Sequence, residues 1–236
     1  MLHAFNIKNV RRVLHDRPGE HKNAKNEDAV TSMVFTPLVF MTTSEASRCL
    51  ALALGPGFTA VAGEMNFASH HVDFWPSDLS ASSWNQRQDA SRCEPDVVVR
   101  FRNGDGAYLA VLIEMKWDWK VTDEHLTREV ARQRAAIRED HRWANATIVT
   151  ATVAKHYPGR PAGIDVATTW IDILARLKDL QRRTGTLADG RPLHVWAELV
   201  GNFLERVDIR AFQGFADWAG LQPTFPQSPV FYRSAS

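Results

Sequence analysis

The stretch EPDVVVRFRNGDGAYLAVLIEMKW, residues 94–117, decides the fold that we expect for this chain. It holds two runs of β-branched and aliphatic residues, 95–101 and 108–116, and the Asn-Gly-Asp-Gly sequence between them is a strong turn signal. The stretch therefore predicts a β-hairpin. Its open end carries Asp96, Glu114 and Lys116, and burying charge in a sheet costs free energy unless the charges serve a purpose.

The turn sets which of these charged residues face one another. A three-residue Gly-Asp-Gly loop places Asn103 opposite Ala107, and the same register places Asp96 opposite Glu114, with β-carbons about 5 Å apart. Lys116 lies two residues further on and shares that face. A two-residue loop would shift the register by one residue and put the acids on opposite faces.

Paired acids beside a lysine suit one kind of chemistry. Two adjacent carboxylates repel each other unless a cation joins them, and oxygen ligands of this kind suit Mg²⁺ or Mn²⁺. Such a metal can polarise a phosphate and lower the pKa of a bound water, and a neighbouring lysine can stabilise the transition state. The cluster predicts a phosphodiester hydrolysis site, and the lysine and the hairpin geometry favour it over a carboxylate-pair glycosidase.

The same residues resemble the motif of the PD-(D/E)XK nuclease superfamily, which has the restriction-endonuclease-like fold. The matching positions are Pro95, Asp96, Glu114 and Lys116. The resemblance implies an αβββαβ core and a bound Mg²⁺, for which Mn²⁺ can substitute. It assigns the metal to Asp96, Glu114 and the backbone carbonyl of Met115, and it gives Lys116 the role of assisting the nucleophilic water.

Two helices offer further residues that members of this family often carry. Glu27 lies on an apolar stripe with Val30 and Val34, where the family often places a Glu that faces the metal, so it is a possible metal ligand. Gln133 lies on the apolar line of the later helix, and a buried Gln needs partners that an active site would supply. Ile137 stands where many members have an aromatic residue, so the fuller QxxxY pattern is not met.

The rest of the chain reads as a mixed α/β protein with helices on the faces of a central sheet. Before the hairpin, the pattern predicts a polar arm or short helix over 1–22, a helix from residue 23, a helix over 44–54, a possible strand over 58–67 and a loop over 70–93. After the hairpin, it predicts a helix over 122–143, a strand over 146–153 and further helices beyond 163. We expect a single domain over 1–236, with a nuclease-like core at about 23–155 and a helical C-terminal extension at about 164–236.

Composition limits the class of protein but does not decide its ligand. The chain is 44% hydrophobic and 23% charged, as is usual for a globular protein, and its two cysteines are too few for a disulfide framework. No apolar run approaches the roughly 18 residues of a membrane span, and the N-terminus does not resemble a signal peptide, so we expect a cytoplasmic protein without a membrane partner. The near balance of 28 Lys and Arg against 27 Asp and Glu neither requires nor excludes nucleic acid.

Residues beside the predicted site offer contacts for a nucleic acid. The candidates are Trp117 or Trp119 for stacking on a base, Lys120 for a phosphate, and Arg128 and Arg132, with Arg138 and Arg142, for following the backbone. Packing in the core or in a lid is an equal alternative for the tryptophans. A solvated helix face with Glu129 and Glu139 interleaved is the alternative for the arginines.

Two functions from different classes follow. The first is a Mg²⁺-dependent nuclease acting on DNA, for which the resemblance to the family implies a setting in bacterial restriction, anti-phage defence or repair. The second is a catalytically silent subunit of the same fold that binds nucleic acid or serves complex assembly, although such a subunit would have no reason to keep paired acids. The apolar faces of the C-terminal helices suit either core packing or an interface with a second copy or a partner subunit.

Overall fold

A computed structural model describes residues 24–62, 66–81, 92–117, 122–143, 145–155, 161–183, 191–207 and 209. At its centre is a five-stranded sheet in the order β1-β4-β5-β6-β7. The strands are β1 (Phe67–Phe74), β4 (Val97–Asn103), β5 (Tyr108–Met115), β6 (Thr147–Ala154) and β7 (Val166–Thr169). β1, β4 and β5 pair antiparallel, and β5, β6 and β7 pair parallel, so the predicted α/β class with a mixed sheet is confirmed.

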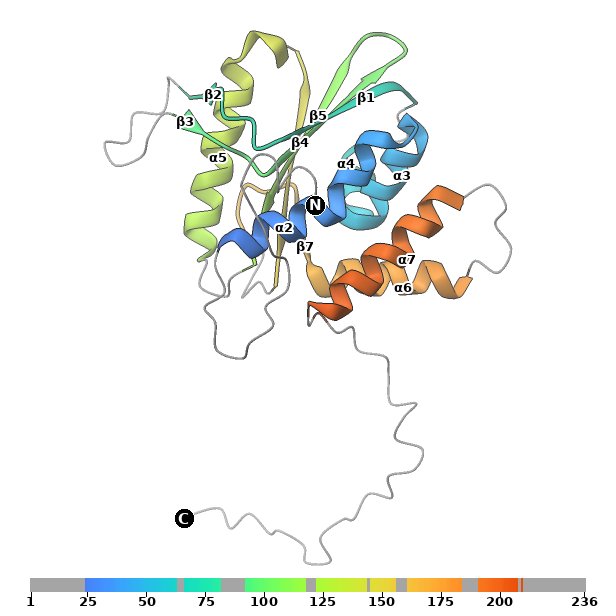
Figure 1. Ribbon diagram of the computed structural model, residues 1–236. Coiled ribbons are helices and arrows are strands. Elements are labelled where there is room, and N and C mark those ends of the chain that lie inside the picture. Colours follow the sequence, from blue (N-terminus) through green and yellow to red (C-terminus); the bar gives the residue numbers. More distant parts are fainter. Residues whose placement is uncertain are drawn as a thin grey trace, which may run out of the picture.

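Helices cover both faces of this sheet (Figure 1). Helix α5 (Asp123–Glu139) lies on one face, and the other helices gather on the opposite side. They are α2 (Ala24–Phe35), the 3₁₀ helix η1 (Thr36–Phe40), α3 (Thr43–Leu54), α4 (Pro56–Ala62), α6 (Trp170–Arg183) and α7 (Arg191–Arg206). A short 3₁₀ helix, η2 (His141–Trp143), follows α5, and β2 (Leu79–Ser80) pairs with β3 (Arg92–Cys93) next to it.

The alternation of side chains along the hairpin divides the core in two. Val97 and Ile113 join the larger apolar cluster with α2, α3, α4, α6 and α7, whereas Val98 and Leu112 join the smaller cluster with α5. Because successive side chains in a strand point to opposite faces, even-numbered hairpin residues face α5. Glu114 therefore belongs to the α5 face of the sheet.

The hairpin has the predicted register. Val97 pairs with Ile113 and Val98 with Leu112, and the Asn103 backbone N–H donates to the Ala107 carbonyl across 3.0 Å. Gly106 has a φ of 86°, which L-residues with a side chain rarely adopt, so glycine is required at this point of the turn. The three-residue loop is confirmed, and the same register, carried one residue beyond the Val97–Ile113 pair, would place Asp96 opposite Glu114.

Several expected elements differ from those observed. A strand over 58–67 is wrong, because 56–62 form the short helix α4 and only Phe67 begins a strand. The loop expected over 70–93 is wrong at its start, since β1 extends to Phe74. The alternation of apolar and polar residues in β1 is weak because β1 is a polar edge strand whose register shifts between Phe67 and Ser69. The purely helical segment expected beyond 163 begins instead with β7, whose four residues are too short to show a period.

The two C-terminal helices are confirmed and pack against the rest of the molecule. Trp170, Leu174 and Leu177 of α6 are fully buried, and the Trp196 indole of α7 donates to the Val34 carbonyl of α2 across 2.9 Å. The predicted N-terminal arm lies outside the described residues, as does the tail beyond 209. None of the described helices combines the length and apolar composition that a membrane crossing requires.

Candidate active site

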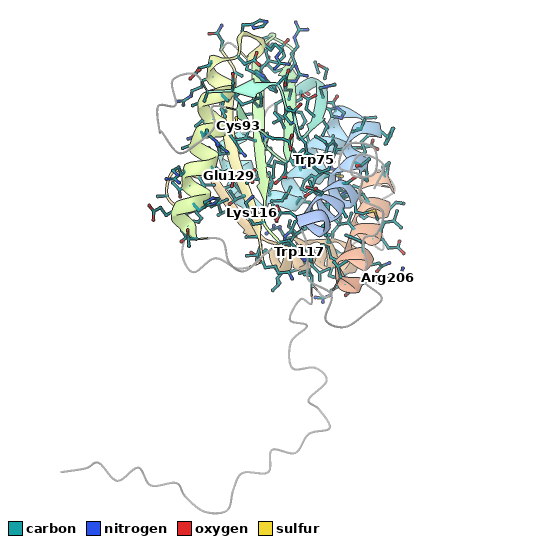
Figure 2. The ribbon with its side chains drawn as sticks, turned by 60° about the vertical axis from the view of Figure 1, so that its left-hand side comes forward. Trp75, Cys93, Lys116, Trp117, Glu129 and Arg206 are labelled. Carbon is teal, nitrogen blue, oxygen red and sulfur yellow. The ribbon has the colours of Figure 1, made fainter. Side chains whose placement is uncertain are left out.

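The predicted site residues meet at the end of the sheet where β4 begins and β5 ends. Asp96 immediately precedes β4, Glu114 lies near the end of β5, and Lys116 directly follows β5. Glu27 comes from the first turn of α2 on one face of the sheet, and Gln133 comes from α5 on the other. Figure 2 shows Lys116 at this end of the molecule, next to Glu129 of α5 and above Trp117.

Asp96 is held by hydrogen bonds to both of its carboxylate oxygens. The Met115 backbone N–H donates to Oδ2 across 2.7 Å, and the Trp75 indole Nε1–H donates to Oδ1 across 3.2 Å. Asp96 exposes only 7% of its surface. Burial raises the pKa of Asp96 to about 7; Lys116 opposes this rise and the charge of Glu27 adds to it.

Glu114 is the most deeply buried acid of the site, with 2% of its surface exposed. Its Oε1 forms an ion pair with the Lys116 ammonium, and its Oε2 accepts a hydrogen bond from Gln133 Nε2 across 2.7 Å. Burial and the neighbouring charge of Asp96 together raise the pKa of Glu114 well above its usual value. The two acids therefore disfavour each other's ionised form, as paired carboxylates do.

Lys116 lies among several acids. Besides Glu114, its Nζ lies 3.4 Å from a carboxylate oxygen of Glu129 and 3.9 Å from one of Glu27. Burial lowers the pKa of Lys116, but the surrounding carboxylates, led by Glu114, outweigh it and raise the pKa above its usual value. The lysine is therefore a permanent cation within an excess of negative charge.

Glu27 connects α2 to the end of β5. Its Oε2 accepts a hydrogen bond from the Trp117 backbone N–H across 2.6 Å. Burial raises the pKa of Glu27 to about 7, although Lys116 lowers it. An acid on an apolar stripe is thus explained by its place at the site, and the structure brings both Glu27 and Gln133 to the predicted cluster.

Helix α5 contributes one residue that the sequence pattern did not single out. Glu129 enters the sequence analysis only as part of an alternative solvated helix face, yet it lies beside Lys116, one helical turn before Gln133. The spacing of four residues from Gln133 places both side chains on one side of the helix, and this was the available signal. Trp75 was also missed, since it lies in the stretch read as a loop.

Of Trp117, Trp119 and Lys120, which were predicted to contact nucleic acid, the structure describes only Trp117. Trp117 exposes 7% of its surface, with the Lys155 ammonium 4.3 Å from its ring centroid and the Trp170 ring edge-on at 5.7 Å. This packing favours a role in the core over stacking on a base. Trp119 and Lys120 lie outside the described residues.

On α5, Arg128 is exposed and Arg132 is half-buried. Arg142 lies instead in ion pairs with Asp78 and Asp140, so it belongs to a separate surface cluster.

The donor set suits a divalent cation. Asp96 and Glu114 provide the hard oxygen ligands that Mg²⁺ prefers; burial, with neighbouring carboxylates as a smaller cause, raises their pKa values, and a bound cation would favour their ionised forms. Gln133 Oε1 is buried and has no hydrogen-bond partner among the described residues, so it can accept from a metal-bound water. Within the described ranges, no three His, Cys, Asp or Glu side chains form a group able to hold a metal. The Met115 carbonyl and water would have to complete the coordination.

A comparison of the chain with models of protein families, with curated proteins and with solved structures finds no match. The function must therefore be inferred from the site itself.

Proposed function

We propose that this protein is a metal-dependent nuclease of the PD-(D/E)XK superfamily with a restriction-endonuclease-like core. The observation that carries the proposal is the pair of buried acids, Asp96 and Glu114, facing each other beside Lys116 at the open end of the β4–β5 hairpin. The order α2, β1, β4, β5, α5, β6 also supports the αβββαβ core of that family, with α3 and α4 inserted after the first helix.

The metal would be Mg²⁺, with Mn²⁺ as a substitute, held by Asp96, Glu114 and the carbonyl of Met115. When bound, it would supply a water of lowered pKa and neutralise charge on a phosphate oxygen. Glu27, whose carboxylate lies 3.9 Å from the Lys116 ammonium, would interact with waters around such a metal in this proposal.

The protein's own side chains have distinct tasks in this scheme. Lys116 keeps its proton and stabilises the negative charge that develops on the phosphate during attack. Gln133 Nε2 orients the Glu114 carboxylate, and Gln133 Oε1 accepts a hydrogen bond from water. Trp75 and the Met115 N–H fix the orientation of Asp96.

We propose DNA as the substrate, in bacterial restriction, anti-phage defence or repair, within the cytoplasm. Arg128 and Arg132 on α5 support a path for the phosphate backbone because they lie on the helix that also carries Glu129 and Gln133. This setting follows from the resemblance to the family alone.

An interface through the C-terminal helices is part of the same proposal. Val195 and Leu199 of α7 are 49% and 64% exposed, and Phe40 of η1 is 75% exposed. They line an open apolar groove of about 660 Å³ between α2, η1 and α7. A groove of this composition supports contact with a second copy or a partner subunit.

A catalytically silent nuclease-fold subunit is the alternative. It is favoured by the absence, within the described ranges, of a group of three metal-ligating side chains and by the ion pair that already engages Glu114.

Cleavage assays separate these functions. Purified protein is incubated with supercoiled plasmid, linear duplex, single-stranded DNA and RNA, in Mg²⁺, Mn²⁺ or EDTA. The nuclease proposal predicts metal-dependent cleavage of at least one substrate and its loss in Glu114→Gln. Cleavage that survives EDTA, or that Glu114→Gln retains, would overturn it.

A further inference from the structure

Trp75, which lies beside Asp96 of the site, has an unusual backbone conformation. It follows the last residue of β1, and its backbone N–H donates to the Asp96 carbonyl across 3.1 Å. Its φ is 46°, in the left-handed region that non-glycine residues rarely adopt. The next residue is Pro76, and a residue before proline normally has an extended backbone. Trp75 is thus held in place against two local preferences.

The conformation of Trp75 places its side chain in a hydrogen bond with Asp96. The residue is 3% exposed, and its indole Nε1–H donates to Asp96 Oδ1 across 3.2 Å. The Met115 N–H donates to the other oxygen, so one donor from β5 and one from the residue after β1 fix the plane of the carboxylate. Each oxygen of an ionised carboxylate accepts more than one bond, so both retain capacity for a cation.

We propose that Trp75 is a positioning residue, whose indole N–H and constrained backbone orient the Asp96 carboxylate toward the divalent cation of the active site. The proposal rests on the metal-dependent function proposed above. Groups that hydrogen-bond to metal ligands set the ligands' orientation, and their loss typically costs about 10- to 100-fold in metal affinity or activity.

The chain offers a matched control for the test. Trp143 is 5% exposed, like Trp75, and its Nε1 has no hydrogen-bond partner among the described residues. It lies beside Arg100, in the apolar cluster on the α5 face of the sheet. Trp143→Phe therefore removes a buried indole N–H without removing a hydrogen bond to the site.

The experiment measures Mn²⁺ binding by calorimetry in the full chain, together with the Mg²⁺ concentration that gives half-maximal cleavage. Trp75→Phe is expected to weaken Mn²⁺ binding about 10-fold or more, and to raise the Mg²⁺ requirement so that high Mg²⁺ partly restores the rate. Trp143→Phe should leave both quantities unchanged. If Trp75→Phe does not fold, benzothienylalanine at position 75 replaces the N–H with sulfur while keeping the shape of the ring.

The outcomes separate this proposal from the proposed function. Suppose that wild type binds Mn²⁺, that Glu114→Gln does not, and that the folded variant at position 75 binds Mn²⁺ as tightly as wild type. The proposed role of Trp75 is then wrong, while the proposed metal site is supported. If wild type binds no Mn²⁺, or Glu114→Gln binds it equally well, both proposals fail.

Discussion

At the scale of single residues, the site is defined by an imbalance of charge. Glu27, Asp96, Glu114 and Glu129 all lie near Lys116, and burial raises the pKa of the first three. An unpaired buried charge is unfavourable, so a fold with these acids is less stable when they are ionised. The site therefore reduces the stability of the metal-free protein at neutral pH.

This imbalance predicts how stability depends on pH without metal. The pKa values of Glu27 and Asp96 rise from 4.5 and 3.8 to about 7, so between about pH 4 and pH 7 the folded protein keeps protons that the unfolded chain has released. The free energy of unfolding must then decrease as pH rises through this window. In EDTA, the melting temperature should fall from pH 5 to pH 8.

Glu114→Gln should flatten that fall, and it is a suitable variant because the Gln133 amide can turn to offer its Oε1 to the new side chain. Adding Mg²⁺ should raise the wild-type melting temperature more at pH 8 than at pH 5. A melting temperature equally dependent on pH in wild type and variant would show that Glu114 does not contribute to this dependence.

Lys116→Met tests the cation at the centre of the cluster. Removing one partner of a buried ion pair leaves the other uncompensated and typically costs about 3–5 kcal/mol of unfolding free energy. We expect a loss of about 3 kcal/mol at pH 8, a smaller loss at pH 5, and a cleavage rate lower by about 10²-fold or more.

Lys178→Met is the matched control, since Lys178 of α6 has a side chain that is 21% exposed and pairs with Glu205 of α7 across 2.9 Å. It should cost about 1 kcal/mol or less, with no change in cleavage. Equal losses of stability in the two variants would place Lys116 in an ordinary surface ion pair.

At the scale of elements, helix α5 combines core packing with a polar contact. Gln133 lies in line with Leu126, Val130 and Ile137, all buried, yet its amide donates to Glu114. Gln133→Leu should keep or raise the melting temperature of the metal-free protein, because it removes a buried amide whose Oε1 has no partner among the described residues, while cleavage falls about 10-fold or more.

A glutamine outside the site provides the comparison. Gln181 Nε2 donates to the Ala197 carbonyl between α6 and α7, so Gln181→Leu should lower stability without lowering the rate per folded molecule. Full cleavage activity in Gln133→Leu would show that Gln133 has only a packing role.

The same elements show what the sequence could and could not predict. The hairpin register was predictable because its turn and its alternation agree, and Gln133 was visible as a polar residue on an apolar line. Glu129 could not be predicted as a site residue, because the sequence around an acid among arginines on a helix is the same whether the acid faces water or a buried lysine. The strands β1 and β7 were missed because one is a polar edge strand and the other has four residues.

At the scale of the whole molecule, the site depends on both layers of helices. Helices α2 and α5 lie on opposite faces of the sheet (Figure 1). Glu27 comes from α2, which packs in the larger apolar cluster, and Gln133 comes from α5, which packs in the smaller one. The sheet between them supplies Asp96, Glu114 and Lys116. Glu27 of α2 and Glu129 of α5 join the two hairpin acids only when both faces are packed, so the assembled fold holds together charges that repel one another.

The claim on which the rest depends is that Asp96 and Glu114 bind a divalent cation. Anomalous diffraction at the manganese edge, from crystals of the wild-type protein soaked in MnCl₂, tests it most directly. We predict an anomalous peak between the Asp96 and Glu114 carboxylates, about 2.1 Å from an oxygen of each, a distance typical of small octahedral cations. Soaked crystals with no peak there, or with peaks only at the molecular surface, would contradict the claim.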